Sequence, residues 1–227
     1  MSSQPKLNVI TFSGIDGAGK STQVSALISS LREAAIRYEM LTFWDDVAVL
    51  SRFREFISCA AFKGDPGVGT PEKPVTRRDK NVSSWPVTAA RIFFYIADSI
   101  RLRLLISKLR QKDLDAVIFD RYIYDELANL PLRRSWARFV ARVLMVLAPE
   151  PDAAFLIDAD PVAARARKPE YPLEFLYRNR ESYLALSRMS AAFVVVGPLP
   201  AQHMTIKIND SLRKGLPLKQ LRPVTPQ

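Results

Sequence analysis

Cysteine and histidine are almost absent from this chain of 227 residues. Cys59 is the only cysteine, so no disulfide bond can form within the chain. His203 is the only histidine, which argues against histidine-based catalysis and against a histidine metal cluster. No apolar run reaches the roughly 18 to 20 residues of a membrane-spanning helix, and residues 1–10 lack the charged and apolar regions of a signal peptide. We therefore expect a cytoplasmic protein.

The composition favours one folded domain. Hydrophobic residues make up 48% of the chain, which is enough at this length to bury a sizeable core. No internal repeat or second composition regime divides the sequence, so we expect a single domain over residues 1–227, with a flexible tail at 216–227. The formal net charge is +10, and such a field attracts polyanions of any kind, including nucleotides, nucleic acid and acidic membranes.

A phosphate-binding motif lies in the stretch FSGIDGAGKST, residues 12–22. Gly14, four further residues and then Gly19-Lys20-Ser21 match the G-x-x-x-x-G-K-[ST] pattern of a P-loop. The apolar and β-branched residues before it predict a buried strand, and the apolar spacing over 22–37 predicts a helix after it. A glycine-rich turn that only closes a strand–helix unit is the alternative, but the lysine and the hydroxyl residue at their required positions favour the P-loop.

The residue types of this motif suit phosphate chemistry. Gly14, Gly17 and Gly19 let the backbone turn tightly and point its N–H groups at phosphate oxygens, aided by the positive end of the following helix. Lys20 would reach the β- and γ-phosphates, and the Ser21 hydroxyl would bind Mg²⁺. A nucleotide is therefore the expected ligand.

A second metal-binding group is expected at Asp120. This carboxylate ends the apolar stretch 115–120, which we predict to be a buried strand. The end of such a strand is where a P-loop protein places the aspartate that orders Mg²⁺. Alternatively, Asp120 caps the next helix.

Strands and helices alternate along the rest of the chain. Further strands are predicted at 38–43, 153–158 and 193–197, and further helices at 47–61, 87–109, 131–147, 173–189 and 201–214. This order predicts an α/β protein with the three-layer P-loop NTPase fold: a five-stranded parallel sheet, helices on both faces, and the ligand at the carboxyl ends of the strands.

Two segments have open interpretations. Residues 63–86 are rich in proline and glycine and include the basic cluster 77–80; they form either a mobile lid or substrate loop, or a disordered insertion. In the helix 131–147, a stripe of Arg134, Arg138 and Arg142 is either a solvated face or a contact with nucleic acid or an acidic membrane surface.

Several motifs together resemble thymidylate kinases. Residues 12–23 are similar to the opening of that family, and Asp120-Arg121-Tyr122 to its second signature. In the same order, 94–98 is similar to its substrate helix, and 165–183 to its arginine-bearing lid and the helix that follows. The resemblance spans nearly the whole chain.

The resemblance implies a set of roles. ATP would be the phosphate donor, with GTP left open, and Mg²⁺ the metal. The implied nucleotide-binding residues are Gly14, Asp16, Gly17, Ala18, Gly19, Lys20, Ser21 and Thr22. Ser21 and Asp120 would hold the metal. The implied catalytic residues are Lys20, Arg121, Arg165 and Arg167, and the implied acceptor-binding residues are Asp16, Tyr95, Asp98 and Arg121.

The catalytic positive charge is expected from a short lid at 165–172. Gly17 stands where some family members carry a P-loop arginine, so Arg165 or Arg167 would instead close onto the γ-phosphate. Such an arginine contributes roughly 10³- to 10⁵-fold to phosphoryl transfer. The alternative is that both arginines lie on an ordinary helix surface.

The acceptor half departs from the family pattern. Ser99 stands where an arginine helps to read the thymine. Residues 43–46, Phe-Trp-Asp-Asp, replace a segment that binds the acceptor phosphate, and two acidic residues there would repel a phosphate. Asp125 replaces a serine. We therefore expect the part of the site that binds the phosphate donor to match the family pattern, and the part that binds the acceptor to differ from it.

Three functions fit the sequence. The first is an ATP-dependent phosphotransferase of the thymidylate kinase type, whose small acceptor is dTMP, another nucleotide, a nucleoside or a non-nucleotide hydroxyl compound; such a kinase could be a homodimer. The second is a nucleotide-dependent switch or ATPase without a small acceptor. The third is a basic module bound to nucleic acid or membrane. Lys20, Ser21 and Asp120 together speak against the third.

Overall fold

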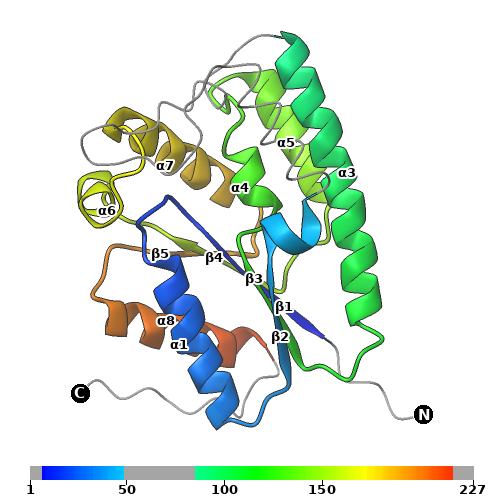
Figure 1. Cartoon of the computed structure of the whole chain (residues 1–227), viewed down its shortest axis with the longest axis vertical. Coiled ribbons are helices and arrows are strands. Elements are labelled where there is room, and N and C mark those ends of the chain that lie inside the picture. The colour runs from blue at the N-terminus through cyan, green and yellow to red at the C-terminus, as the bar shows by residue number, and fades with distance from the viewer. Residues whose placement is uncertain (1–6, 49–84, 217–227) are drawn as a thin grey trace.

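The computed structural model describes residues 7–48 and 85–216 (Figure 1). The strands are β1 (Asn8–Ser13), β2 (Tyr38–Thr42), β3 (Ala116–Asp120), β4 (Ala153–Ile157) and β5 (Phe193–Val196). The helices are α1 (Lys20–Glu33), the single-turn π-helix η1 (Phe43–Val47), α3 (Trp85–Leu109), α4 (Ile123–Leu127), α5 (Ser135–Leu147), α6 (Pro161–Arg167), α7 (Leu173–Ser187) and α8 (Ala201–Gly215). Most of the predicted helix 47–61, the loop up to residue 84 with its basic cluster, and the tail from 217 lie outside the described residues.

The five strands form one parallel sheet in the order β2-β3-β1-β4-β5. This confirms the predicted α/β fold with a five-stranded parallel sheet. All six residues of the central strand β1 are buried, as expected for a strand covered on both faces. The register pairs Phe12 with Asp120, so the end of β3 lies beside the start of the P-loop.

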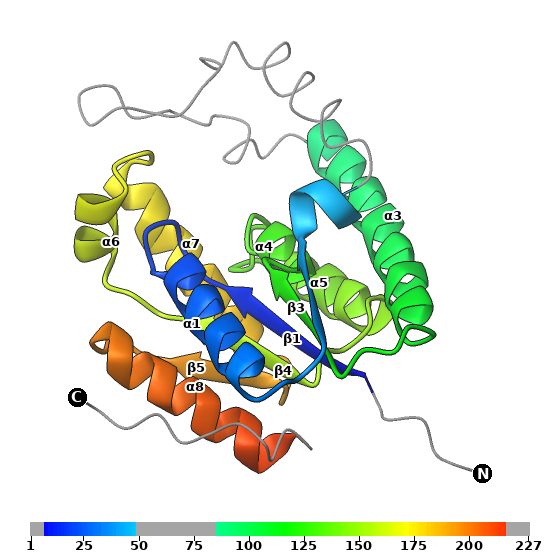
Figure 2. The same cartoon turned by 60° about the horizontal axis from the view of Figure 1, so that its bottom comes forward.

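Helices cover both faces of the sheet (Figures 1 and 2). The helices α1 and α8 pack together on one face, and α3, α4, α5 and α7 lie on the other. The core is made by apolar side chains of the strands, such as Phe12 and Phe155, and by the inward stripe of α1 at Val24, Leu27 and Leu31. No helix in the described part of the chain is both long and apolar enough to span a membrane.

Several elements differ from the sequence prediction. The helix α1 begins at Lys20 and ends at Glu33, and Ala35 beyond it has a left-handed backbone with φ 53°. The helix α3 already begins at Trp85, inside the segment predicted as loop. The sequence did not predict α4, because five residues are too few to show a helical period.

Candidate functional site

The loop after β1 is shaped by close contacts at two glycines. A Cβ atom on Gly14, which has φ 145°, would lie 2.5 Å from the carbonyl oxygen of Ile157 at the end of β4. Gly17 has φ 79°, and a Cβ there would overlap the carbonyl oxygen of Ala164 in α6. The helix α6, called the lid helix below because it carries Arg165 and Arg167, therefore lies directly on the loop. No residue with a side chain fits at position 17 unless α6 moves.

Lys20 is the first residue of α1, and its side chain is buried inside the P-loop. Its side chain is 6% exposed, and its Nζ donates to the carbonyl oxygens of Gly14 at 2.7 Å and Ile15 at 2.9 Å. Burial and then the nearby Arg121 lower the pKa of Lys20 to about 8, although the carboxylates around it oppose this shift. The carbonyl bonds keep the ammonium where phosphate oxygens would lie in a P-loop.

Arg121 has a strained backbone at the end of β3. Its φ of 71° is uncommon for a residue with a side chain, and its N–H donates to the carbonyl oxygen of Phe12 at 2.9 Å. Its guanidinium lies between two carboxylates: 2.5 Å from Asp16 and 3.6 Å from Asp125. Such strain persists only where the surroundings fix it, and it is commonly found at functional sites.

Asp16 is kept ionised by the positive side chains around it. Burial by itself would raise the pKa of Asp16, but the charges of Arg121, Lys20 and Lys168 and the hydrogen bond from Arg121 bring it down to about 2. Lys168 was not among the predicted site residues. It follows α6 directly, so its field reaches Asp16 only because α6 is packed on the loop.

The residues predicted to hold Mg²⁺ fit a divalent cation. Burial raises the pKa of Asp120, and no hydrogen bond or ion pair to its carboxylate is formed by residues 7–48 or 85–216. A bound cation would compensate this desolvation. Ser21 is exposed in the first turn of α1. No group of three or more histidine, cysteine, aspartate or glutamate side chains that could hold a metal ion occurs in the described residues.

Asp125 is the centre of a buried hydrogen-bond network that the sequence did not predict. Its carboxylate accepts hydrogen bonds from Ser13 Oγ at 2.7 Å, the backbone N–H of Tyr122 at 3.0 Å and the hydroxyl of Tyr183 at 2.8 Å. It thus joins β1, the start of α4 and α7, and at the same time faces Arg121. The only available signal was that an aspartate stands at the place of a serine.

The lid helix α6 is anchored at both sides. Its N-cap residue Asp160 accepts a hydrogen bond from Ala163 N at 3.0 Å. After the lid, Arg180 of α7 forms a bidentate pair with Asp158 at 2.6 and 2.7 Å. The structure places Arg165 and Arg167 at the end of α6; Arg167 Nε donates to Ala163 O at 3.2 Å. No hydrogen bond among the described residues joins Arg165 or Arg167 to the P-loop.

Two similar proteins carry the same name. A "Probable thymidylate kinase" of Metallosphaera sedula is 23% identical over 220 residues, which cover 92% of this chain and 94% of the relative. A "Probable thymidylate kinase" of Archaeoglobus fulgidus is 23% identical over 219 residues, which cover 93% and 98%. The chain is thymidylate kinase-like. The predicted resemblance is thereby confirmed along nearly the whole chain, although no protein-family model matches it.

The helix α3 contains the segment that is similar to the family's substrate helix, and its predicted site residues are buried. Tyr95 is 3% exposed, and Asp98 and Ser99 are fully buried. Ser99 Oγ donates to the carbonyl oxygen of Tyr95 at 2.7 Å, so the residue at the place of the base-reading arginine has a structural bond. Roles for Tyr95 and Asp98 in acceptor binding stay predictions.

The acidic pair after β2, Asp45 and Asp46, accepts hydrogen bonds from the last residue of that strand. The Asp46 carboxylate accepts from the backbone N–H of Thr42 at 2.7 Å, and the Asp45 carboxylate accepts from Thr42 Oγ1 at 2.7 Å. Both bonds fix the start of η1. The carboxyl end of β2 thus carries two negative charges, where the family resemblance would place a phosphate-binding segment.

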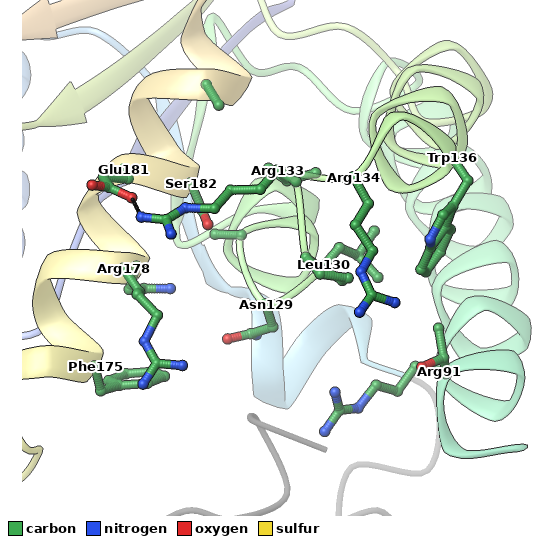
Figure 3. A pocket seen from close by; sticks show the side chains of 16 residues that line it. Arg91, Asn129, Leu130, Arg133, Arg134, Trp136, Phe175, Arg178, Glu181 and Ser182 are labelled. Carbon is green, nitrogen blue, oxygen red and sulfur yellow. Dashed lines mark hydrogen bonds and ion pairs between the residues drawn. The ribbon is translucent and has the colours of Figure 1, made fainter. Parts of the chain in front are cut away.

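A pocket opens beside these elements in the thymidylate kinase-like chain (Figure 3). Its volume is about 400 Å³, and its walls come from the first turns of α3, the segment 128–136 and one face of α7. Four arginines line it, at positions 91, 133, 134 and 178, together with the aromatic side chains of Trp136 and Phe175. None of these pocket residues was among the predicted site residues, because they come from three separate parts of the chain.

Proposed function

We propose that this protein is a kinase that transfers the γ-phosphate of ATP to a small acceptor. One arrangement carries the proposal: buried Lys20 in a P-loop, with Asp120 and Arg121 at the end of the neighbouring strand and α6 lying on the loop. The names of the two relatives support a nucleotide kinase. The combination suits charge neutralisation and exclusion of water at a phosphate, which a transferase needs so that its acceptor, and not water, receives the phosphate.

The residues would act on the transferred phosphate as follows. Lys20 would exchange its bonds to the Gly14 and Ile15 carbonyls for bonds to the β- and γ-phosphate oxygens. Backbone N–H groups at the start of α1 would bind the remaining phosphate oxygens. Ser21 and Asp120 would hold Mg²⁺, which neutralises charge on the phosphates when bound. Arg165 or Arg167, at the end of the lid helix, would turn toward the γ-phosphate.

The test is nucleotide turnover by the full chain. ADP formation from Mg²⁺-ATP is measured with dTMP, other nucleoside monophosphates, nucleosides and sugars as acceptors, and again with GTP as donor. Lys20→Ala should abolish acceptor-dependent ADP formation, whereas Lys207→Ala, a lysine on the exposed face of α8, should not change it. Lys20-dependent turnover that no acceptor stimulates would favour the switch or ATPase; turnover that is indifferent to Lys20 would refute the kinase.

We further propose that the protein is a homodimer. Large apolar side chains are exposed along the packed helices α3 and α5, among them Phe93 at 68%, Leu104 at 60%, Phe139 at 67% and Val146 at 81%. An exposed apolar face of this kind suits a twofold dimer, in which the same face of each subunit covers the other. Sedimentation velocity should give a dimer for wild type and a monomer for Leu104→Glu. A wild-type monomer that co-sediments with anionic vesicles would indicate membrane contact instead.

A further inference from the structure

The pocket in Figure 3 has more positive than negative charge on its walls. Two of its four arginines have carboxylate partners: Arg133 pairs with Glu181 and Arg178 with Glu174, each at 2.7 Å. Arg91 and Arg134 form no ion pair with any residue in 7–48 or 85–216. Figure 3 shows these two side chains on the same side of the opening, Arg134 from one wall and Arg91 from another. Two such guanidinium groups are suited to bind one phosphate or carboxylate.

The pocket also holds an unused hydrogen-bond acceptor. Asn129 Nδ2 donates to the carbonyl oxygen of Asp125 at 3.0 Å, whereas Asn129 Oδ1 is buried and has no hydrogen-bond partner. A buried polar atom without a partner is costly, so a ligand hydroxyl or N–H at this position would be favourable. Figure 3 shows the Asn129 amide within the space between the pocket walls.

The pocket residue Asn129 lies one helical turn beyond Asp125, which contacts the end of the strand that leads into the P-loop. Asp125, which accepts a hydrogen bond from Ser13 at the end of β1, precedes Asn129 by four residues in α4 and the turn after it. One helical turn corresponds to roughly 5 Å along the axis. In this arrangement an acceptor would have its reacting end on the P-loop side of Asn129 and its other end at Arg91 and Arg134.

The charges near the P-loop, where the acceptor would react, differ from those at the far end of the pocket, at Arg91 and Arg134. After β2, the carboxylates of Asp45 and Asp46 place two negative charges where the family resemblance would put the acceptor phosphate. Arg121 is already paired with Asp16 and with Asp125. Within residues 7–48 and 85–216, the ends of β2 and β3 thus offer an acceptor anion no unpaired arginine, whereas the far end of the pocket offers two, the reverse of what a nucleoside monophosphate acceptor requires.

We propose that the acceptor is a hydroxyl compound with an anionic group at its far end, such as a phosphorylated or carboxylated sugar or polyol. This inference rests on the proposed kinase function. The anion would bind Arg91 and Arg134, and Asn129 Oδ1 would accept from a hydroxyl. The reacting hydroxyl oxygen forms a bond to the γ-phosphorus, the bond between that phosphorus and the β–γ bridging oxygen breaks with its electron pair going to ADP, and the hydroxyl proton is released to water.

Matched acceptor pairs test the proposal. ADP formation is measured with glycerol and glycerol 3-phosphate, ribose and ribose 5-phosphate, and glucose with glucose 6-phosphate and glucuronate; thymidine and dTMP are included. The phosphorylated and carboxylated members distinguish the two kinds of anion. We expect an anionic sugar or polyol to exceed its neutral partner by at least roughly tenfold in kcat/KM, and to exceed dTMP.

A variant pair identifies the residues responsible. The double variant Arg91→Ala/Arg134→Ala should raise KM for the anionic acceptor by roughly 10- to 100-fold, as expected for the loss of charged hydrogen bonds, and should leave KM for ATP unchanged. Arg188→Ala, an exposed arginine outside the pocket, is the control. An unchanged KM for the acceptor in the double variant, or a preference for the neutral partner or for dTMP, would overturn the proposal.

Failure of the inference can be told apart from failure of the kinase. If ADP formation depends on Lys20 but shows no preference for the anionic acceptors, the proposed kinase function stands and the inference about the acceptor is wrong. If no acceptor in the set is phosphorylated, calorimetric binding of the same phosphorylated sugars decides: binding that is lost in the double variant and kept in Arg188→Ala supports the inference, and absence of such a difference overturns it. Loss of Lys20 dependence removes the kinase itself.

Discussion

Replacement of Asp125 should lower the free energy of unfolding more than replacement of an acidic residue on the surface. Its carboxylate accepts three hydrogen bonds, from Ser13, Tyr122 and Tyr183, and lies 3.6 Å from the Arg121 guanidinium. The side chain is 4% exposed, so little solvent is available to replace these contacts. Asp125→Ala therefore leaves buried donors and part of the charge on Arg121 without a partner.

The size of the effect follows from what is left unpaired. Hydrogen bonds to a charged group contribute about 1.5–3 kcal/mol each, and breaking a buried charged network by removing one member costs about 3–5 kcal/mol. We expect Asp125→Ala to lower the free energy of unfolding by about 3–5 kcal/mol. Asp125→Ser, which introduces the residue type expected from the family resemblance, should also be destabilising, because one hydroxyl cannot replace a carboxylate that accepts from three donors.

Urea unfolding followed by circular dichroism measures the effect. Asp210→Ala is the matched control, because Asp210 is exposed and lies 3.9 Å from its partner Arg213. Exposed pairs of this kind contribute about 0–1 kcal/mol. If the free energies of unfolding of Asp125→Ala and Asp210→Ala differ by less than about 1 kcal/mol, the network does not hold β1, α4 and α7 together as we infer.

Three further outcomes are expected. Because the pKa of Lys20 is lowered to about 8, ATP affinity measured by calorimetry should fall as pH rises from 7 to 9, and Lys20→Arg should remove this dependence; an unchanged affinity would contradict the role of the ammonium. The pKa of Asp16 is about 2 against its ordinary 3.8, so its stabilising effect is present above pH 3.8 and is lost as pH falls through 2. At about 1.4 kcal/mol per pKa unit this effect is about 2–3 kcal/mol, and Asp16→Asn should lack this acid-dependent loss in thermal unfolding. Gly17→Ala should lower stability by about 1–3 kcal/mol, because φ is 79° and the new Cβ meets Ala164 of α6, whereas Gly215→Ala, where a Cβ meets no atom within 4 Å, should be neutral or slightly stabilising; equal effects would refute the close contact.

The sheet and the phosphate loop could be predicted because their signals are local. A buried parallel strand is an apolar run of five or six residues, as in 116–120 and 153–157, and the P-loop is one contiguous motif. The alternation of strands and helices predicted that the strands are parallel, but not their order in the sheet. The boundaries of α1 and α3 were less accurate, because periodicity does not show where a cap or a turn ends a helix.

The Asp125 network and the lid contact could not be predicted, because they depend on tertiary packing. Ser13, Asp125 and Tyr183 are far apart in the sequence, and only the packing of α4 and α7 brings them together. Likewise, the absence of a side chain at Gly17 is visible in the sequence, but its reason, the approach of Ala164, is not. The same holds for the pocket, whose arginines come from α3, the segment before α5, and α7.

The replacement of a serine by Asp125 changes the interpretation of Arg121. The resemblance implies that this arginine meets the acceptor phosphate, but here its guanidinium faces two carboxylates, Asp16 and Asp125, in a partly buried site. An acceptor phosphate would have to compete with both and would approach their negative charges. A donor γ-phosphate bound as we propose would be differently placed, because Lys20 and the first turn of α1 add positive charge on its side of the site. Arg121 is therefore better suited to orient Asp16 beside the donor phosphate than to bind an acceptor phosphate, and this leaves recognition of the acceptor to groups farther from the P-loop.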